Sequence, residues 1–447
     1  MIRSRTILLA LLLALPVPGR AQEDSTAVTG KKNTFTVDAN ILMRGELRYG
    51  GLPSSDGGTS AGAGTTTPKK AAFILERTRL AVGYERKWLS ARVEAQHSGT
   101  WGSAENSQFS LYQAWVQLSS RQGLFAKVGR QNLSYDDQRI FGADEWAVTG
   151  MSHDALILGY EGKGHKLHLI GAYNQNLANI NGGSYFSGGL QPYKAMEALW
   201  YHYDVPRTAL GFSVLFADFG MQAGEKGVDE KIYHQQVTGA YVSYRPRIWS
   251  AEAAFYYQMG REEHGLPLRA WMCSAKASVK PVDPLKIVAG YDYLSGDVDF
   301  SPPKLGALGL PRHETVRGFN SLYGSHHKFY GAMDFFYVTA YYGGFTPGLQ
   351  NAYLGISYSP VKNLTMGASY HFLATATSLK SAKGPLGHEL ESGISYTFLD
   401  CVTLSAGYTF MKGTETMVLL KRTTDNRTLH WGWIMLTVTP RLFSGKW

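Results

Sequence analysis

Residues 35–49 read Phe35-Thr36-Val37-Asp38-Ala39-Asn40-Ile41-Leu42-Met43-Arg44-Gly45-Glu46-Leu47-Arg48-Tyr49. Apolar and polar residues alternate along nearly all of this stretch, which is the period of a β-strand with one apolar and one polar face. A strand in a soluble protein usually ends after about five or six residues, whereas a strand that crosses a bilayer needs about nine to eleven. The length of the alternation therefore predicts a membrane-spanning strand.

The same alternation recurs to the end of the chain in about eighteen segments. The predicted strands are residues 35–49, 73–85, 89–96, 109–118, 124–130, 153–160, 166–174, 193–203, 209–219, 232–244, 249–259, 268–280, 285–294, 351–358, 364–374, 388–398, 402–411 and 430–439. Short and long connections largely alternate, which is typical of an antiparallel outer-membrane barrel with short periplasmic turns and long external loops. A soluble β-solenoid would repeat with a fixed period, which this sequence lacks. We therefore expect an all-β transmembrane barrel of about eighteen strands.

Composition and the first residues favour the same class. The 447 residues include 50 glycines and 27 tyrosines but only 18% charged residues, which suits many strands and makes helical cofactor domains a poor fit. A basic start, an apolar core at residues 7–15 and a small-residue cleavage signal at 19–21 predict a signal peptide over residues 1–21. Residues 22–32 are then a short periplasmic lead, and residues 33–447 form the barrel in the outer membrane.

The charge of the exported chain is mildly basic. Removal of Arg3, Arg5 and Arg20 with the signal peptide lowers the formal net charge from +9 to +6, because that segment contains no acid. An exported protein is a poor partner for nucleic acid, so the excess is better explained by anionic solutes or by contact with anionic outer-membrane lipid.

A charged segment interrupts the strand pattern between residues 131 and 152. Loops of about twenty residues are usually functional or disordered, and aromatic residues such as Tyr135, Phe141 and Trp146 give this one something to pack. We expect the Gln131–Ser152 loop, together with the long Asp297–Tyr342 loop, to fold over or into the lumen and narrow it.

The alternation also assigns six cations to the lumen face. They are Arg44, Arg48, Arg77, Arg79, Arg92 and Lys127. Lumen charge is expected in any case, because a charge on the lipid face costs about 2–4 kcal/mol at the bilayer midplane. Two interpretations stay open. The arginines could form a structural ion-pair lattice with Asp38, Glu46, Glu85 and Glu94, or they could line an anion path, since the guanidinium fork matches carboxylates and phosphates.

Several motifs resemble the bacterial alginate-export family of outer-membrane barrels. They are Gly129-Arg130-Gln131, Tyr135-Asp136-Asp137-Gln138-Arg139-Ile140, Gly142, Trp146 and Ser152-His153-Asp154, with further similar segments at 76–79, 322–331 and 386–389. The resemblance covers nearly the whole mature chain. It implies an eighteen-stranded channel whose arginine-lined constriction passes an anionic polysaccharide outward. Carried over by residue, it places Arg77 or Arg79, Arg130 and Arg139 at the constriction, with Asp136, Asp137 and Asp154 as acidic partners.

The sequence fits other functions less well than a channel. His153 and Asp154 could serve a barrel hydrolase, but no nucleophile motif supports them. Adjacent His326 and His327 point to opposite faces of an extended chain, so a shared metal is a poor fit. An unselective porin and an adhesive barrel remain alternatives. We expect a monomeric, non-enzymatic channel with no catalytic residue, metal or cofactor. Its expected partners are outer-membrane lipid, an anionic polysaccharide or small anions, and, as an open alternative, periplasmic secretion proteins.

Overall fold

The computed structural model describes residues 33–50, 70–175, 190–224, 230–297, 315–336, 346–379, 382–421 and 428–447. Residues Asn33–Trp447 form one compact unit. The expected signal peptide, residues 1–21, and the lead, residues 22–32, lie outside the described residues and stay predictions. No helix in the described ranges is both long enough and apolar enough to cross a membrane.

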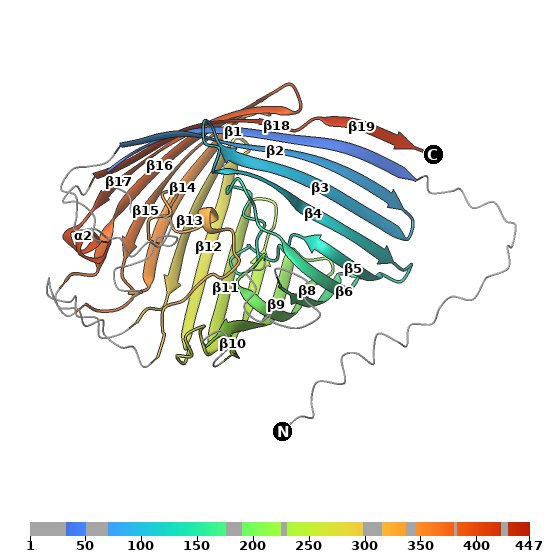
Figure 1. Cartoon of the computed structure of the whole chain (residues 1–447). Coiled ribbons are helices and arrows are strands. Elements are labelled where there is room, and N and C mark those ends of the chain that lie inside the picture. The colour runs from blue at the N-terminus through green and yellow to red at the C-terminus, as the bar shows by residue number, and fades with distance from the viewer. Residues whose placement is uncertain are drawn as a thin grey trace, which may run out of the picture. The chain divides into compact units, whose positions relative to one another are not determined.

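The described residues form a single antiparallel sheet of nineteen strands (Figure 1). Its strands are β1 (Thr34–Tyr49), β2 (Lys70–Arg86), β3 (Leu89–Thr100), β4 (Ser107–Ser119), β5 (Leu124–Gln131), β6 (His153–Gly162), β7 (His165–Tyr173), β8 (Tyr193–Asp204), β9 (Leu210–Ala223), β10 (Lys231–Tyr244), β11 (Trp249–Gly260), β12 (Ala270–Val282), β13 (Leu285–Leu294), β14 (Leu349–Val361), β15 (Leu364–Ala374), β16 (Pro385–Phe398), β17 (Val402–Gly413), β18 (Thr428–Val438) and β19 (Arg441–Lys446). From β1 to β18, each strand pairs with its neighbour in chain order.

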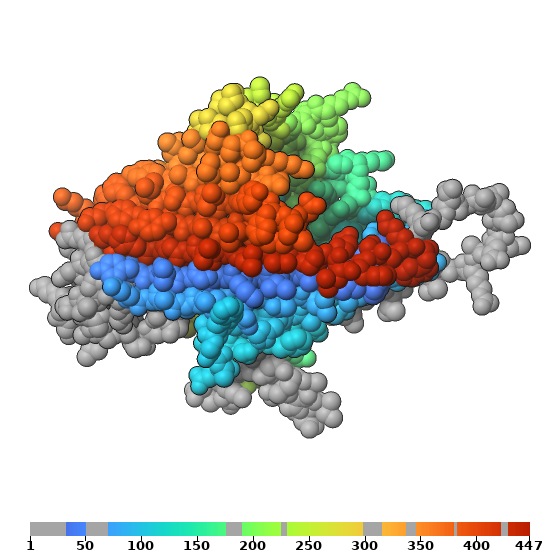
Figure 2. Space-filling view, turned by 90° about the horizontal axis from the view of Figure 1, so that it is seen from above, coloured from blue at the N-terminus to red at the C-terminus, as the bar shows by residue number. Residues whose placement is uncertain are grey.

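The first and last strands close the sheet into a barrel. β1 pairs with β2 on one side and with both β18 and β19 on the other, from Tyr49↔His430 down to Thr34↔Lys446. β18 and β19 are therefore two parts of one last strand. The break falls at Pro440, which lacks an amide hydrogen for the ladder, although its carbonyl still accepts from Ala39 N at 3.0 Å. Figure 2 shows the blue N-terminal strand beside the red C-terminal ones. The expected eighteen-stranded barrel is confirmed.

The two faces of the sheet differ as the alternation predicts. On β2, the inward-facing Arg77 and Arg79 are each 3% exposed. The next residue, Leu80, faces outward and is 48% exposed. Apolar residues on the outward face of other strands, such as Leu354 and Ile434, are each 56% exposed. A closed ladder satisfies every backbone group inside the sheet, and an apolar exterior matches hydrocarbon. The barrel is thus suited to a bilayer.

Two segments between strands lie inside the barrel. Residues 132–152 follow β5 and residues 315–336 belong to the connection from β13 to β14. They meet at a parallel bridge between Phe141 and Tyr323, whose rings stack with centroids 6.2 Å apart. Both residues are buried against Tyr193 and Phe219, on inward-facing positions of β8 and β9. The expected inward fold is confirmed for 132–152 and for the described part of 297–342.

One short helix was not expected from the sequence. α2 spans Glu415–Lys421 in the connection from β17 to β18, and Met417 and Leu420 on it are buried. The ammonium of Lys421 lies 5.6 Å from the ring centroid of Phe335, so this helix packs against the inward segment 315–336.

Candidate functional site

Five inward-facing arginines on β1, β2 and β3 form one surface, here called the arginine wall. Its members are Arg44, Arg48, Arg77, Arg79 and Arg92. Strand register spreads them along the wall, because Arg48 lies opposite Ala71 near one end of β2 and Arg92 lies opposite Gly83 near the other. The side chains of Arg44, Arg77 and Arg79 are each 4% exposed. The structure therefore places all five predicted wall residues on the lumen face.

Two strand carboxylates pair with the arginine wall. Glu46 accepts from Arg44 Nε at 2.9 Å and lies 2.8 Å from Arg48 Nη2. Glu94 lies 2.9 Å from Arg92 Nη2 and 3.9 Å from Arg79 Nε. The ion-pair lattice thus exists in part.

The other two carboxylates expected in the lattice do not join it. Asp38 is bound by Arg441 on β19, 2.8 Å away, and none of the ion pairs found in the described ranges involves Glu85.

A third carboxylate reaches the arginine wall from the inward loop. Glu145 lies 2.8 Å from Arg79 Nη1 and 3.1 Å from Arg77 Nη1. Among these pairs three carboxylates serve five arginines, because Arg44 and Arg48 share Glu46, and Arg79 and Arg92 share Glu94. The loop backbone is also held to this surface, because Trp146 O accepts from Arg44 Nη1 at 2.8 Å and Thr149 O accepts from Gln96 Nε2 at 3.0 Å.

Arg139 occupies a different position from the arginine wall. Its guanidinium donates to Asp137 at 2.8 Å, to Asp292 on β13 at 2.7 Å and to the Tyr330 hydroxyl at 2.8 Å. Burial opposes the charged form, but Tyr330, Asp292 and Asp137 together raise the pKa of Arg139 well above its ordinary value. The residue ties both inward segments to the barrel, because its three partners belong to the loop after β5, to the segment before β14 and to β13.

The expected lumen position of Arg130 is wrong. Arg130 and Lys127 on β5 are three residues apart, and side chains at odd spacing on a strand point to opposite faces. Lys127 lies inside, over the Trp115 ring at 4.0 Å, while Arg130 shares the outward face with Val128, which is 50% exposed. Arg130 binds both carboxylate oxygens of Asp154 at 2.8 Å. This pair joins β5 to β6 on the outside of the barrel.

The three predicted acidic partners have three different environments. Asp137 holds Arg139 and Asp154 holds Arg130, as expected. Asp136 pairs with none of the arginines that the structure describes; it accepts a hydrogen bond from Trp200 Nε1 at 3.1 Å. Burial is the main reason that the pKa of Asp136 is raised above its ordinary value.

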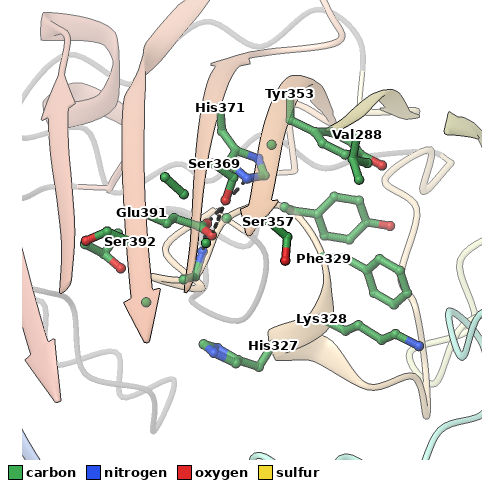
Figure 3. A pocket seen from close by; sticks show the side chains of 18 of the residues that line it. Val288, His327, Lys328, Phe329, Tyr353, Ser357, Ser369, His371, Glu391 and Ser392 are labelled. Carbon is green, nitrogen blue, oxygen red and sulfur yellow. Dashed lines mark hydrogen bonds and ion pairs between the residues drawn. The ribbon is translucent and has the colours of Figure 1, made fainter. Parts of the chain in front are cut away.

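A cavity of about 490 Å³ lies between residues 327–332 and the inner face of β14–β17 (Figure 3). Its wall is hollow because small residues such as Gly367 and Gly393 face the lumen there, and their neighbours leave room for a side chain. Glu391 closes one side by accepting hydrogen bonds from Ser369 Oγ and Ala332 N. Lys328 lies at the rim, where burial lowers its pKa below the ordinary value.

Sequence reasoning gave no role to Glu145 or Tyr112, although Glu145 belongs to the charged loop. Their contact with the arginine wall joins residues 33 and 66 positions apart. No local pattern carries such a pairing, because it depends on how the loop crosses the lumen.

No protein-family model matches this sequence. A search of curated proteins likewise finds no match. Solved structures do resemble it. OpdL of Pseudomonas aeruginosa has 11% sequence identity and a TM-score of 0.59, over 92% of this chain and 99% of that one. OpdQ of the same organism has 12% identity and a TM-score of 0.55, over 91% and 98%.

A third similar structure is Pseudomonas aeruginosa OpdK with vanillate, at 9% identity and a TM-score of 0.57, over 92% of this chain and 99% of that one. Such identities show a common fold and nothing more. The comparisons do not support the alginate-export family in particular. The chain therefore has the fold of these outer-membrane porins.

Proposed function

We propose that this protein is a monomeric outer-membrane channel that passes small anionic solutes along the arginine wall. The observation that carries the proposal is the set of three inward-facing arginines, Arg44, Arg77 and Arg79, that contact the loop where it crosses the lumen. Arginine remains charged throughout the physiological range, and its planar fork suits brief contact with carboxylates. Rings of such side chains favour anions in other pores.

Small solutes fit this channel better than a polymer. The inward segments 132–152 and 315–336 meet inside the barrel and pack a buried aromatic cluster into the lumen. A polysaccharide chain would need an unobstructed path along the barrel axis. The vanillate in the OpdK structure is a small carboxylate, which is consistent with this solute class for a barrel of the same fold.

The test is the reversal potential of the refolded protein in a planar bilayer under a potassium chloride gradient. We expect an anion-selective wild type and a markedly weaker anion preference in Arg77→Gln, because that variant removes a lumen cation. Arg130→Gln is the matched control, since it makes the same chemical change on the outward face and should leave selectivity unchanged. A wild type without ion preference would instead indicate a general porin.

A further inference from the structure

The arginine wall binds a carboxylate of the protein's own inward loop, and the proposed channel function does not explain this contact. Glu145 Oε2 lies 2.8 Å from Arg79 Nη1 and 3.1 Å from Arg77 Nη1. Its other oxygen, Oε1, accepts a short hydrogen bond of 2.6 Å from the Tyr112 hydroxyl. A carboxylate on a loop thus fills a position surrounded by two guanidinium groups and a phenol.

The groups around this carboxylate are fixed in advance. The Arg79 guanidinium lies over the Tyr112 ring at 3.4 Å, and its Nε donates to Gln96 Oε1 at 2.6 Å. Asn132 donates to the Tyr112 oxygen at 2.8 Å, which leaves the phenolic proton free to point at Glu145. A rigid set of donors aimed at one carboxylate is the arrangement expected of a binding site.

Glu145 is the partner that can leave. Its side chain is 49% exposed, whereas those of Arg77 and Arg79 are each 4% exposed. The backbone of the loop keeps its own bonds to the barrel, from Arg44 to Trp146 O and from Gln96 to Thr149 O. The Glu145 side chain can therefore swing away while the loop stays in place.

The arginines cannot remain without an anion. A buried charge that loses its partner is strongly destabilised. With Glu145 gone, Glu94, 3.9 Å from Arg79 Nε, is the one carboxylate among the described residues that still forms an ion pair with Arg77 or Arg79. Within the described residues, Arg77 Nε and Arg79 Nη2 have no hydrogen-bond partner even with Glu145 bound. Donors therefore remain for an incoming anion.

We propose that Arg77, Arg79 and Tyr112 form a carboxylate-binding site in the channel, and that Glu145 is its built-in ligand, which a passing carboxylate displaces. The site takes a solute with one exposed carboxylate, because two oxygens are needed to meet both the guanidinium groups and the phenol. Glu145 keeps the site charge-balanced between solutes and prevents a solute from binding too tightly to leave. This inference rests on the proposed function and names the solute class of the same site.

The test is isothermal titration calorimetry of benzoate with the purified, full-length barrel in detergent micelles. Glu145→Gln keeps the size of the side chain and removes its charge, so it no longer competes for the arginines. In the wild type the loop holds the Glu145 carboxylate near the arginines at an effective concentration of about millimolar, where it competes with benzoate. Its removal in Glu145→Gln should therefore make benzoate bind about tenfold more tightly. Neutral benzamide should show no gain.

Glu252→Gln is the matched control, because Glu252 is another lumen carboxylate but pairs with Lys276 and Arg245. If benzoate binds Glu145→Gln no more tightly than wild type, or if Glu252→Gln gains as much, the displacement site is overturned. Glu145→Ala repeats the test should the glutamine still occupy the site, and circular dichroism verifies that each variant is folded.

The anion channel and the carboxylate site are tested by different measurements, so either proposal can fail without the other. Reversal potentials judge the anion channel, whereas calorimetry judges the carboxylate site without any current. An anion-selective wild type with no gain in Glu145→Gln would overturn only the site.

Discussion

At the scale of single residues, one position of register separates a lumen charge from a surface charge. Lys127 and Arg130 lie on the same strand, yet Lys127 contacts Trp115 inside the barrel and Arg130 contacts Asp154 outside it. The same strictness places Arg77 and Arg79, two residues apart, side by side on the lumen face. Function in this barrel therefore depends on the parity of each position as much as on the residue type.

Lys328 gives a prediction at this scale. Burial lowers its pKa below the ordinary 10.5, although the nearby Asp137 opposes the shift. A lysine with a lowered pKa loses its charge earlier as the pH rises. Part of the anion preference should therefore disappear through the alkaline range below pH 10.5, as measured by reversal potentials at a series of pH values.

Lys328→Arg is the control for this prediction, because a guanidinium keeps its charge up to about pH 12. The variant should retain its anion preference over the range in which the wild type loses it. Identical pH profiles for the two proteins would remove Lys328 from the ion path.

At the scale of elements, the two inward segments hold one another through Trp146. Its ring stacks on His327 with centroids 4.0 Å apart, and the Arg44 guanidinium lies 3.9 Å from its centroid. His327 is fixed in turn by Asp334, whose carboxylate lies 2.8 Å from Nδ1. One indole therefore joins the loop after β5, the segment before β14 and the arginine wall.

Trp146→Ala should loosen this junction. We expect a larger single-channel conductance, and a loss of at most about 3 kcal/mol in the free energy of unfolding, because the ring is only partly buried. Single-channel recording and urea unfolding in micelles measure the two effects. Trp101→Ala, in an exposed loop, should change neither. An unaltered conductance in Trp146→Ala would mean that the two segments do not limit the pore.

At the scale of the whole molecule, a closed barrel surrounds a lumen that two inward segments partly fill. Closure comes from β1 pairing with β18 and β19, which leaves no open edge within the membrane. The restriction comes from segments 132–152 and 315–336, which bring a buried aromatic cluster into the lumen. Under the proposed function, the inward segments leave less room for a solute than the barrel alone would.

Size exclusion is the prediction that belongs to the whole molecule. Liposomes containing the protein should take up small carboxylates such as acetate and benzoate, while a long acidic polysaccharide should show no detectable uptake. Protein-free liposomes provide the baseline. Passage of the polymer through the wild type would contradict the narrow path and restore the export function that the family resemblance implies.

The amino-acid sequence by itself determined the barrel. Strand alternation such as that of residues 35–49 is local, and a period of two assigns each side chain to a face without knowledge of any other strand. The strand count, the alternation of turns and loops, and the lumen position of Arg77 and Arg79 all followed from it. Arg130 is the exception, because its expected lumen position rests on the family resemblance and not on the alternation.

Only the tertiary structure decided which charges meet. Glu145 reaches Arg77 and Arg79 across 66 to 68 residues, and Arg139 reaches Asp292 across 153. Such pairs form because the loops cross the lumen, where a buried charge must find a partner. The course of a loop depends on packing against strands far away in the chain, such as Phe141 on Phe219. Periodicity carries no information about these distant contacts, so they could not be predicted from the sequence.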